Sequence, residues 1–306
     1  MRRLLLAGAL AAAWTAAALA QVPPDVAAQL RVIGRVVDTG KTAAIYAPLQ
    51  PPKPSSVAFE RDIAYGPDPK EVLDVAHPAG ARGAPVLIYM HGGAYVGGDK
   101  SRNAKGEPSV FSDNIMVWAT ANGMVGVNMN YPLAPGAPYP AAQQDIGKVI
   151  AWVQANIAKY GGDPRHVFLW GHSAGASHVA TYVAHPEFYP GKDSGLSGAI
   201  MSSGTYDLTL GPQRPNPYFG DPSAFAQRQA MPGLLKTKTP LFVATAELDP
   251  PAMNEQEVLV HDALCAQGRC PAGGMMKDES HMSESYSVGT ADQTVSAPVL
   301  AFIRAH

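Results

Sequence analysis

The pattern of apolar and polar positions predicts that strands and helices alternate along most of the chain. Short, mostly apolar runs at residues 86–90, 124–129 and 167–170 are typical of strands buried on both faces. Between them, residues 110–121 and 141–159 carry apolar side chains at helical spacing. The later part of the chain continues the alternation, with helices expected at 174–184, 253–265 and 294–306 and strands at 199–201, 241–246 and 274–276. This order predicts an α/β protein with a mostly parallel central sheet and helices on both faces.

A helix and a hairpin are expected before this alternation. Residues 23–37 have helical apolar spacing, and Gly40 is expected to end the helix. Residues 47–56 contain four prolines and are interpreted as an irregular connection. Residues 56–65 and 72–77 are expected to be paired strands, because the Gly-Pro-Asp-Pro turn between them interrupts two strand-like runs.

One stretch departs from the alternation. Residues 204–235 are rich in Pro, Gly and aromatic side chains. We expect this stretch to cross the carboxyl edge of the sheet, where ligands bind in open α/β folds. The alternative is a plain surface loop.

The first twenty residues have the pattern of a targeting segment. Arg2 and Arg3 precede an apolar run at residues 4–20, which is interrupted only by Thr15. The run ends in Ala-Leu-Ala, a small-x-small pattern typical of signal-peptidase sites. We therefore expect a cleaved signal peptide over residues 1–20 and a periplasmic or secreted protein without a stable membrane anchor. An uncleaved anchor helix is the alternative, although seventeen residues are at the short end for a bilayer span.

These boundaries give the expected organisation of the chain. A mature chain would start near Gln21, residues 21–55 would form the N-terminal helix and its connection, and residues 56–306 would form one catalytic domain. The whole chain has 306 residues, 23 of them basic and 25 acidic, a formal charge of −2. Loss of Arg2 and Arg3 would leave 21 basic residues against 25 acidic ones, a charge of −4. No basic surplus is present to hold a phosphate backbone, which argues against a nucleic-acid-binding protein.

The sequence has two cysteines, Cys265 and Cys270, and four residues separate them. In an oxidising compartment such a pair can close a small disulfide loop, which is the interpretation we favour. Two free, buried thiols are the alternative. A metal site would need further soft ligands nearby, and the sequence offers none there. In the chain as a whole no motif indicates a metal or an organic cofactor, and we expect neither.

The strongest chemical motif is Gly171-His172-Ser173-Ala174-Gly175, which follows the strand at 167–170 and opens a helix. This is a G-x-S-x-G motif in the strand–turn–helix context of a nucleophile elbow. A sharp turn of this kind holds Ser173 clear of the sheet, and the two glycines allow neighbouring backbone to come close. The start of the helix presents N–H groups to developing negative charge. His172 is interpreted as structural, because the turn directs adjacent side chains apart.

A second glycine-rich turn, His91-Gly92-Gly93-Ala94, follows the strand at 86–90. Together with the serine elbow, it is interpreted as an oxyanion loop whose N–H groups point at a substrate carbonyl.

A serine nucleophile needs a base, and the base needs an acid that orients it. In this layout the chain order is serine, acid, histidine. His281 lies in a polar loop after the last expected strand and is the favoured base. Asp249 follows the strand at 241–246 and is the favoured acid, with Glu247 as the alternative.

Taken together, these segments resemble the carboxylesterase branch of the α/β-hydrolase fold, near its hormone-sensitive-lipase-like and feruloyl-esterase-like members. The matching segments are HGGAYVGGDK at 91–100, YPLAP at 131–135, GDP at 162–164, the elbow at 171–175, ELDP at 247–250 and His281. The resemblance covers residues 56–306. It implies that Ser173 is the nucleophile, His281 the base and Asp249 the acid, with oxyanion donors from the backbone of Gly93, Ala94 and Ala174.

Two positions depart from the family's pattern. Ala94 replaces the third glycine of the HGGG form, and His172 stands where hormone-sensitive-lipase-like enzymes often carry an acid.

The expected function is hydrolysis of small-molecule carboxylic esters through an acyl-enzyme. An amidase or formamidase with the same triad is one alternative, because both reactions pass through a tetrahedral intermediate. A noncatalytic binding protein on this fold is the other.

Overall fold

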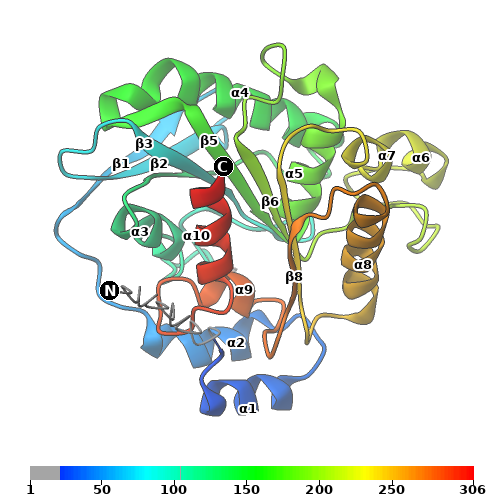
Figure 1. Cartoon of the computed structure of the whole chain (residues 1–306), viewed down its shortest axis with the longest axis horizontal. Helices are drawn as coiled ribbons and strands as arrows, with labels where there is room; N and C mark the ends of the chain where they lie inside the picture. The colour runs from blue at the N-terminus through cyan, green and yellow to red at the C-terminus, as the bar shows by residue number, and fades with distance from the viewer. Residues whose placement is uncertain (1–20, 104) are drawn as a thin grey trace, which may run out of the picture.

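The computed structural model describes residues 21–103 and 105–306, and over these residues it has one eight-stranded sheet (Figure 1). The strand order is β1-β2-β4-β3-β5-β6-β7-β8. Strand β2 runs antiparallel to both neighbours, and every pair from β4 to β8 is parallel. The strands are β1 (Val57–Ala64), β2 (Val72–Pro78), β3 (Ala84–Met90), β4 (Val125–Met129), β5 (Gly162–His172), β6 (Gly198–Ser202), β7 (Leu241–Ala246) and β8 (Ala272–Met276). The mostly parallel sheet and the hairpin are therefore confirmed.

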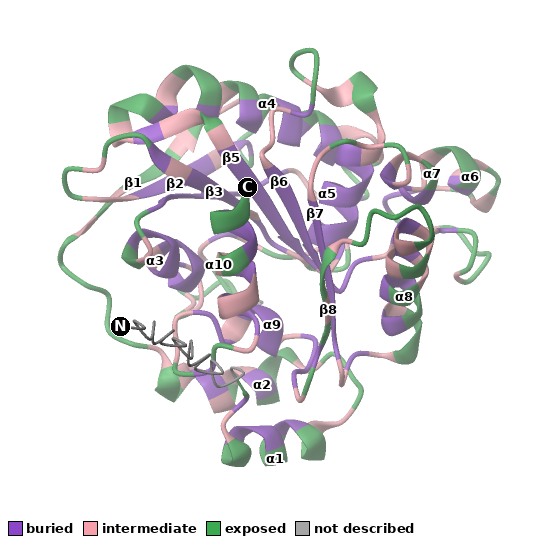
Figure 2. Cartoon of the chain, viewed as in Figure 1, coloured by how far each residue is buried: buried purple, intermediate pink, exposed green. Residues whose placement is uncertain are grey.

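Helices cover both faces of the sheet. One buried cluster joins one face of the sheet to α3 (Asn114–Ala121) and α10 (Ser296–Ala305). A larger cluster joins the other face to α4 (Ala141–Asn156), α5 (Ala174–Ala184) and α8 (Pro251–Ala266). Every residue of β4, β6 and β7 is buried, which explains why these strands are mostly apolar and do not alternate between apolar and polar residues (Figure 2).

The N-terminal part differs from the single long helix predicted over residues 23–37. Helix α1 (Pro24–Ile33) ends at Gly34, whose φ of 81° is one that glycine adopts without steric cost. A second helix, α2 (Thr39–Tyr46), then begins after Asp38, whose carboxylate accepts a hydrogen bond from the N–H of Lys41. Gly40 lies inside this helix, so the prediction that it ends a helix was wrong. The cap on the first turn outweighs the modest helix penalty of one glycine.

Helices α1 and α2 pack beside the carboxyl-end loops of the sheet. Their buried cluster includes Leu30 and Tyr46, and the partly buried Leu248 and Tyr286 pack against it. Leu248 belongs to the loop after β7, and Tyr286 ends the short helix α9 (Ser283–Tyr286). Figure 1 shows α2 next to α9. The N-terminal helices therefore support two loops in which site residues are expected.

The segment 204–235 begins just after the carboxyl end of β6 and contains two short helices, α6 (Phe225–Arg228) and α7 (Met231–Leu234). The ring of Tyr218 stacks on Tyr95 of the glycine-rich loop, with 5.7 Å between centroids, and Phe219 packs edge-on against the same ring. The segment is thus packed onto the expected oxyanion loop at the carboxyl edge, as predicted, and is not a plain surface loop.

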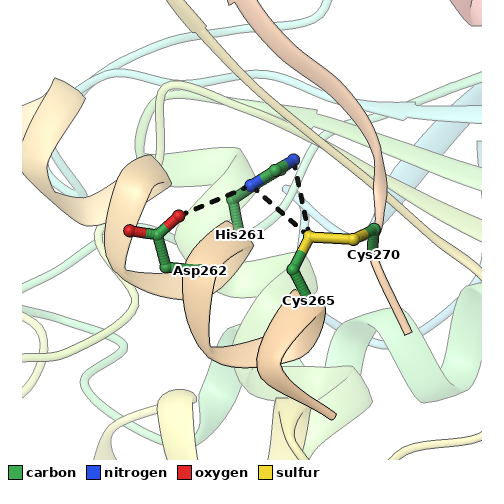
Figure 3. Close-up of a disulfide and its surroundings, with 4 residues drawn as sticks. All are labelled: His261, Asp262, Cys265 and Cys270. Atoms are coloured by element: carbon green, nitrogen blue, oxygen red, sulfur yellow. Dashed lines mark hydrogen bonds and ion pairs between the residues drawn. A yellow bond between two sulfur atoms is a disulfide. The ribbon is translucent and has the colours of Figure 1, made fainter. Parts of the chain in front are cut away.

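The two cysteines form a disulfide, with Cα atoms 4.1 Å apart. Figure 3 shows that it joins the last turn of α8 to the segment that enters β8, with the ring of His261 beside it. It therefore lies toward the amino end of β8, away from the loops that follow the strands.

Among the helices of the described residues, none combines the length and the apolar character needed to span a bilayer. The predicted signal peptide lies outside the described residues.

Candidate active site

Ser173 occupies a strained turn between β5 and α5. Its φ of 57° and ψ of −123° are rarely adopted by a residue with a side chain, and such strain is typical of functional sites. A Cβ atom at Gly171 would lie 2.4 Å from the carbonyl oxygen of Gly175, and one at Gly175 would lie 2.3 Å from that of Met90. Both positions therefore require glycine. The serine itself stays partly exposed, so its hydroxyl can be reached from outside.

The structure brings Ser173, His281 and Asp249 together, although they come from the loops after three different strands. Nε2 of His281 lies 2.9 Å from Oγ of Ser173. On the other side of the ring, Nδ1 lies 2.7 Å from Oδ1 of Asp249. The imidazole thus accepts from the serine hydroxyl and donates to the carboxylate, an arrangement that can carry a proton away from the serine.

Asp249 is fully buried and surrounded by donors. Its second oxygen, Oδ2, accepts hydrogen bonds from Oγ1 of Thr245 at 2.8 Å and from the N–H of Ala246 at 2.9 Å, and also contacts the hydroxyl of Ser203. Burial acts to raise the pKa of Asp249, but the hydrogen bond and charge of His281 and the hydroxyl contacts outweigh burial and hold that pKa below its usual range. The carboxylate is therefore ionised at neutral pH.

Glu247, the alternative acid, lies elsewhere in the same loop. Its carboxylate accepts a hydrogen bond from the N–H of Asp278 at 2.8 Å, which ties the loop after β7 to the loop that leads to His281. Of the two carboxylates left open by the sequence, Asp249 is the one in contact with the imidazole.

The glycine-rich loop after β3 packs directly against Ser173. A Cβ atom at Gly92 would lie 2.8 Å from Cβ of Ser173, so only glycine fits at this contact. The next residues, Gly93, Ala94 and Tyr95, all have positive φ, at 131°, 51° and 71°. Within the described part of the chain, the N–H groups of Gly93, Ala94 and Ala174 have no main-chain hydrogen-bond acceptor. These three donors are free to bind an oxygen atom brought up to Ser173.

The segment 131–135 packs against the glycine-rich loop that begins at His91. The hydroxyl of Tyr131 donates to the carbonyl oxygen of His91 at 2.8 Å, and the two rings stack with 4.6 Å between centroids. Burial lowers the pKa of His91, so its ring is neutral at neutral pH and packs as an aromatic surface.

Four side chains that sequence reasoning did not place at the site contact the triad loops. His172 was interpreted as structural, and its Nε2 lies 2.7 Å from the carbonyl oxygen of His281. Nε of Arg35, beyond α1, donates to the carbonyl oxygen of Asp249 at 2.9 Å. Ser203 and Glu284 form a buried group behind Asp249. Each of these four side chains has a partner that is distant in sequence. No local motif therefore marks these contacts.

Three buried side chains also form a group of a kind that could ligate a cation. They are His172, His281 and Glu284, and their ligating atoms lie within 4.8 Å of one another. However, Nε2 of His172 is occupied by the carbonyl of His281, and both nitrogens of His281 are bound to Ser173 and Asp249. A metal would have to displace these contacts, so the group does not fit a resident ion.

The chain is similar in sequence to proteins that are named as esterases. Residues 73–189 match the family model described as BD-FAE. Esterase LipQ of Mycobacterium tuberculosis is 34% identical over 203 residues, which cover 62% of this chain and 46% of LipQ. Chlorogenic acid esterase of Aspergillus niger is 38% identical over 137 residues, which cover 42% of this chain and 24% of that enzyme. The match to LipQ thus spans less than half of that enzyme's length.

Solved structures match over nearly the whole chain. A bacterial heroin esterase aligns with a TM-score of 0.65 and 19% identity, covering 94% of this chain and 98% of its own. An inhibited esterase B from Lactobacillus rhamnosis aligns with a TM-score of 0.69 and 17% identity, covering 92% and 96%. At this level of identity, the likeness establishes a shared fold.

Proposed function

This chain is an α/β-hydrolase similar to carboxylesterases, and on that premise we propose that it is a serine carboxylesterase with Ser173, His281 and Asp249 as its catalytic triad. One observation carries the proposal. Two hydrogen bonds, of 2.9 and 2.7 Å, connect the hydroxyl of a serine in an elbow turn to an imidazole and then to a buried carboxylate. This is the geometry required of an activated serine nucleophile.

The reaction follows from the positions of these groups. Oγ of Ser173 attacks the ester carbonyl carbon while Nε2 of His281 takes the hydroxyl proton. Asp249 stabilises the imidazolium that forms and holds the ring in the correct tautomer. His281 then gives the proton to the leaving alcohol. A water molecule, deprotonated by the same imidazole, attacks the acyl carbon, and the bond between that carbon and Oγ of Ser173 breaks. His281 returns the proton to Oγ, which releases the acid and restores the free serine.

The oxyanion of the tetrahedral intermediate would be held by backbone N–H groups of Gly93, Ala94 and Ala174. Their lack of main-chain acceptors within the described residues supports this role, as does the contact between Gly92 and Ser173. Donors fixed in this way need no reorganisation when charge develops on the substrate oxygen, which is why they accelerate the reaction. Ala94 keeps the N–H that a glycine would supply at this position.

The substrate class is a small-molecule carboxylic ester. The names of the relatives LipQ and chlorogenic acid esterase describe enzymes that act on esters, and the match to the BD-FAE family model at residues 73–189 includes the elbow. Tyr95 and Tyr218, where the segment 204–235 meets the oxyanion loop, are aromatic and partly or fully buried next to the elbow region. We assign this segment to the wall of the substrate site.

The site of action is the periplasm or the extracellular space. The basic start, the apolar run and the Ala-Leu-Ala sequence at residues 18–20 support export. A disulfide between Cys265 and Cys270 is compatible with an oxidising compartment.

The direct test compares the protein with Ser173→Ala on a series of p-nitrophenyl esters graded by acyl length. Loss of nearly all turnover in Ser173→Ala is expected, while Ser55→Ala, at an exposed serine, serves as the matched control. Matched ester and anilide substrates separate an esterase from an amidase. If the folded protein neither hydrolyses the esters nor reacts with a fluorophosphonate probe, the proposal of a catalytic serine is wrong and a binding role is favoured.

A further inference from the structure

A second buried carboxyl group lies behind the triad and has no part in the mechanism above. Glu284 is on α9, three residues after His281, and its side chain is inaccessible to solvent. Its Oε2 lies 2.5 Å from Oγ of Ser203, and the same hydroxyl also contacts Oδ2 of Asp249. One serine hydroxyl therefore lies between two buried carboxyl groups.

The hydrogen atoms in this group can be counted. A serine hydroxyl has a single hydrogen, so it can donate to only one of its two carboxyl partners. If both carboxyl groups were ionised, one oxygen–oxygen contact would join two acceptors with no hydrogen between them. One of the two carboxyl groups must therefore supply a hydrogen of its own.

The surroundings decide which group carries that hydrogen. Asp249 accepts hydrogen bonds from His281, Thr245 and the N–H of Ala246, as an anion requires. In contrast, Oε1 of Glu284 is buried and has no partner among the described residues. A buried carboxylate with so few donors would be costly, whereas a neutral acid in this position is not.

We propose that Glu284 is a neutral carboxylic acid that donates to Ser203, and that Ser203 in turn donates to Asp249. Both are positioning residues, because they act on the triad only through the carboxylate of Asp249. The hydrogen-bond chain holds this carboxylate in place and adds no second negative charge beside it. The effect on catalysis rests on the function proposed above, whereas the protonation of Glu284 does not.

The charged and titratable groups around Glu284 agree with this assignment. Burial, and then the charge of Asp249, raise the pKa of Glu284 well above its usual range. Nε2 of His172 lies 3.6 Å from Oε2 of Glu284, but its hydrogen is donated to the carbonyl of His281. Glu279, the other acid that acts on Glu284, is itself buried and has a raised pKa. None of these groups provides a cation that would favour an ionised Glu284.

The protonation is tested by infrared difference spectroscopy of the folded protein against Glu284→Gln at about pH 7. We expect the difference to contain the carbonyl stretch of a protonated carboxylic acid. Carboxylate stretches in its place would overturn the proposal. This measurement needs no enzymatic activity, so it decides the state of Glu284 even if the esterase function proves wrong.

The positioning role is tested by kinetics. Gln retains a donor at the position of Oε2, so Glu284→Gln should lower kcat for a p-nitrophenyl ester by no more than about threefold. Glu284→Ala and Ser203→Ala remove the hydrogen-bond chain and should lower kcat by about tenfold or more with little change in KM. Glu257→Gln, at a buried glutamate of α8, is the matched control.

Two results would overturn this role. If Glu284→Gln lost as much activity as Glu284→Ala, a donated hydrogen would not be what the position provides. If Ser203→Ala kept the full kcat, the link to Asp249 would be without effect. Thermal unfolding of each variant shows whether it is folded, and Ser203→Ala and Glu284→Gln still decide the question if Glu284→Ala does not fold.

Discussion

Nε2 of His172 lies 2.7 Å from the main-chain carbonyl oxygen of His281, so the residue before Ser173 binds the loop that carries His281. Both rings are buried and their centroids are 4.8 Å apart. Burial, together with the nearby charge of His281, lowers the pKa of His172 to about 3. His172 is therefore neutral at neutral pH, and its hydrogen lies on Nε2, where the carbonyl accepts it. The contact fixes the imidazole of His281 relative to Ser173.

This contact predicts the effect of His172→Phe. Phenylalanine fills a similar volume but leaves the buried carbonyl of His281 without a donor, which costs about 1–3 kcal/mol of unfolding free energy. The loop that carries the base should also become less ordered, so kcat should fall while KM changes little. Urea unfolding and ester hydrolysis measure the two effects. Wild-type values in both would show that the contact is not needed.

The glycines of the elbow provide a second prediction. Gly175→Ala would place a Cβ atom 2.3 Å from the carbonyl oxygen of Met90 and 2.7 Å from that of His91. Backbone cannot move away as a flexible side chain can, so β3 and α5 must separate. We expect a loss of about 2 kcal/mol or more in unfolding free energy, together with most of the activity.

The matched control for Gly175→Ala is Gly191→Ala, where an added Cβ meets nothing within 4 Å. It should leave both unfolding and ester hydrolysis close to wild type. If Gly175→Ala behaved in the same way, the tight packing of the elbow would not be a requirement for function.

Much of the fold and part of the candidate site could be predicted from the sequence alone. The elements were predictable because buried parallel strands are mostly apolar along their length, and the mostly parallel sheet inferred from them is confirmed. The α/β-hydrolase fold was an implication of the family resemblance, not of these apolar runs. Ser173 was predicted from its motif, and Asp249 and His281 were predicted from their order and placement in the chain. The structure brings these three side chains together. Choosing Asp249 over Glu247 finally required coordinates, because both follow the same strand.

The rest of the site depends on contacts between distant parts of the chain. Ser203 contacts Asp249, which is 46 positions later in the chain, and Glu284, which is 81 positions later. Arg35 donates to the carbonyl oxygen of Asp249, which is 214 positions later. No periodicity or motif encodes such pairs, because they exist only once the sheet has brought the loops together. The break between α1 and α2 was missed although its signals are local, because Gly40 was interpreted as the end of one long helix. Gly34 ends α1, and the cap at Asp38 starts α2.

The disulfide provides a third prediction, which separates stability from activity. It closes a loop of about six residues, for which the entropy of the unfolded chain gives a stabilisation of about 2 kcal/mol. Both cysteines precede β8 (Figure 3). Ser173, Asp249 and His281 lie in loops that follow the strands. The double variant Cys265→Ser, Cys270→Ser should therefore unfold more easily but keep the wild-type kcat. A large fall in kcat in the folded variant would contradict this separation.

A final prediction concerns the stability of the fold in mild acid. His178, on α5, is inaccessible to solvent, and its Nε2 has no partner among the described residues. Burial, and then the charge on His91, lower the pKa of His178 from 6.5 to about 3. Between these two values the unfolded chain binds a proton at this position and the folded chain does not. Lowering the pH through this window therefore favours unfolding.

The size of the effect follows from the number of protons. One proton bound only by the unfolded state changes the unfolding free energy by up to about 1.4 kcal/mol per pH unit. Buried acids with raised pKa, such as Asp145 at about 7, act in the opposite direction, so the wild-type slope is a sum of several groups. The difference between the protein and His178→Gln isolates the histidine.

The measurement is urea unfolding of both proteins between about pH 6.5 and 5, above the range where aspartates with lowered pKa such as Asp249 contribute. His178→Gln should be less stable at neutral pH, because it loses packing against Tyr131 and Tyr218. Its stability should nevertheless fall less steeply as the pH is lowered. His306→Gln, at an exposed position, is the matched control. Parallel slopes for the protein and His178→Gln would mean that this histidine takes up a proton inside the fold.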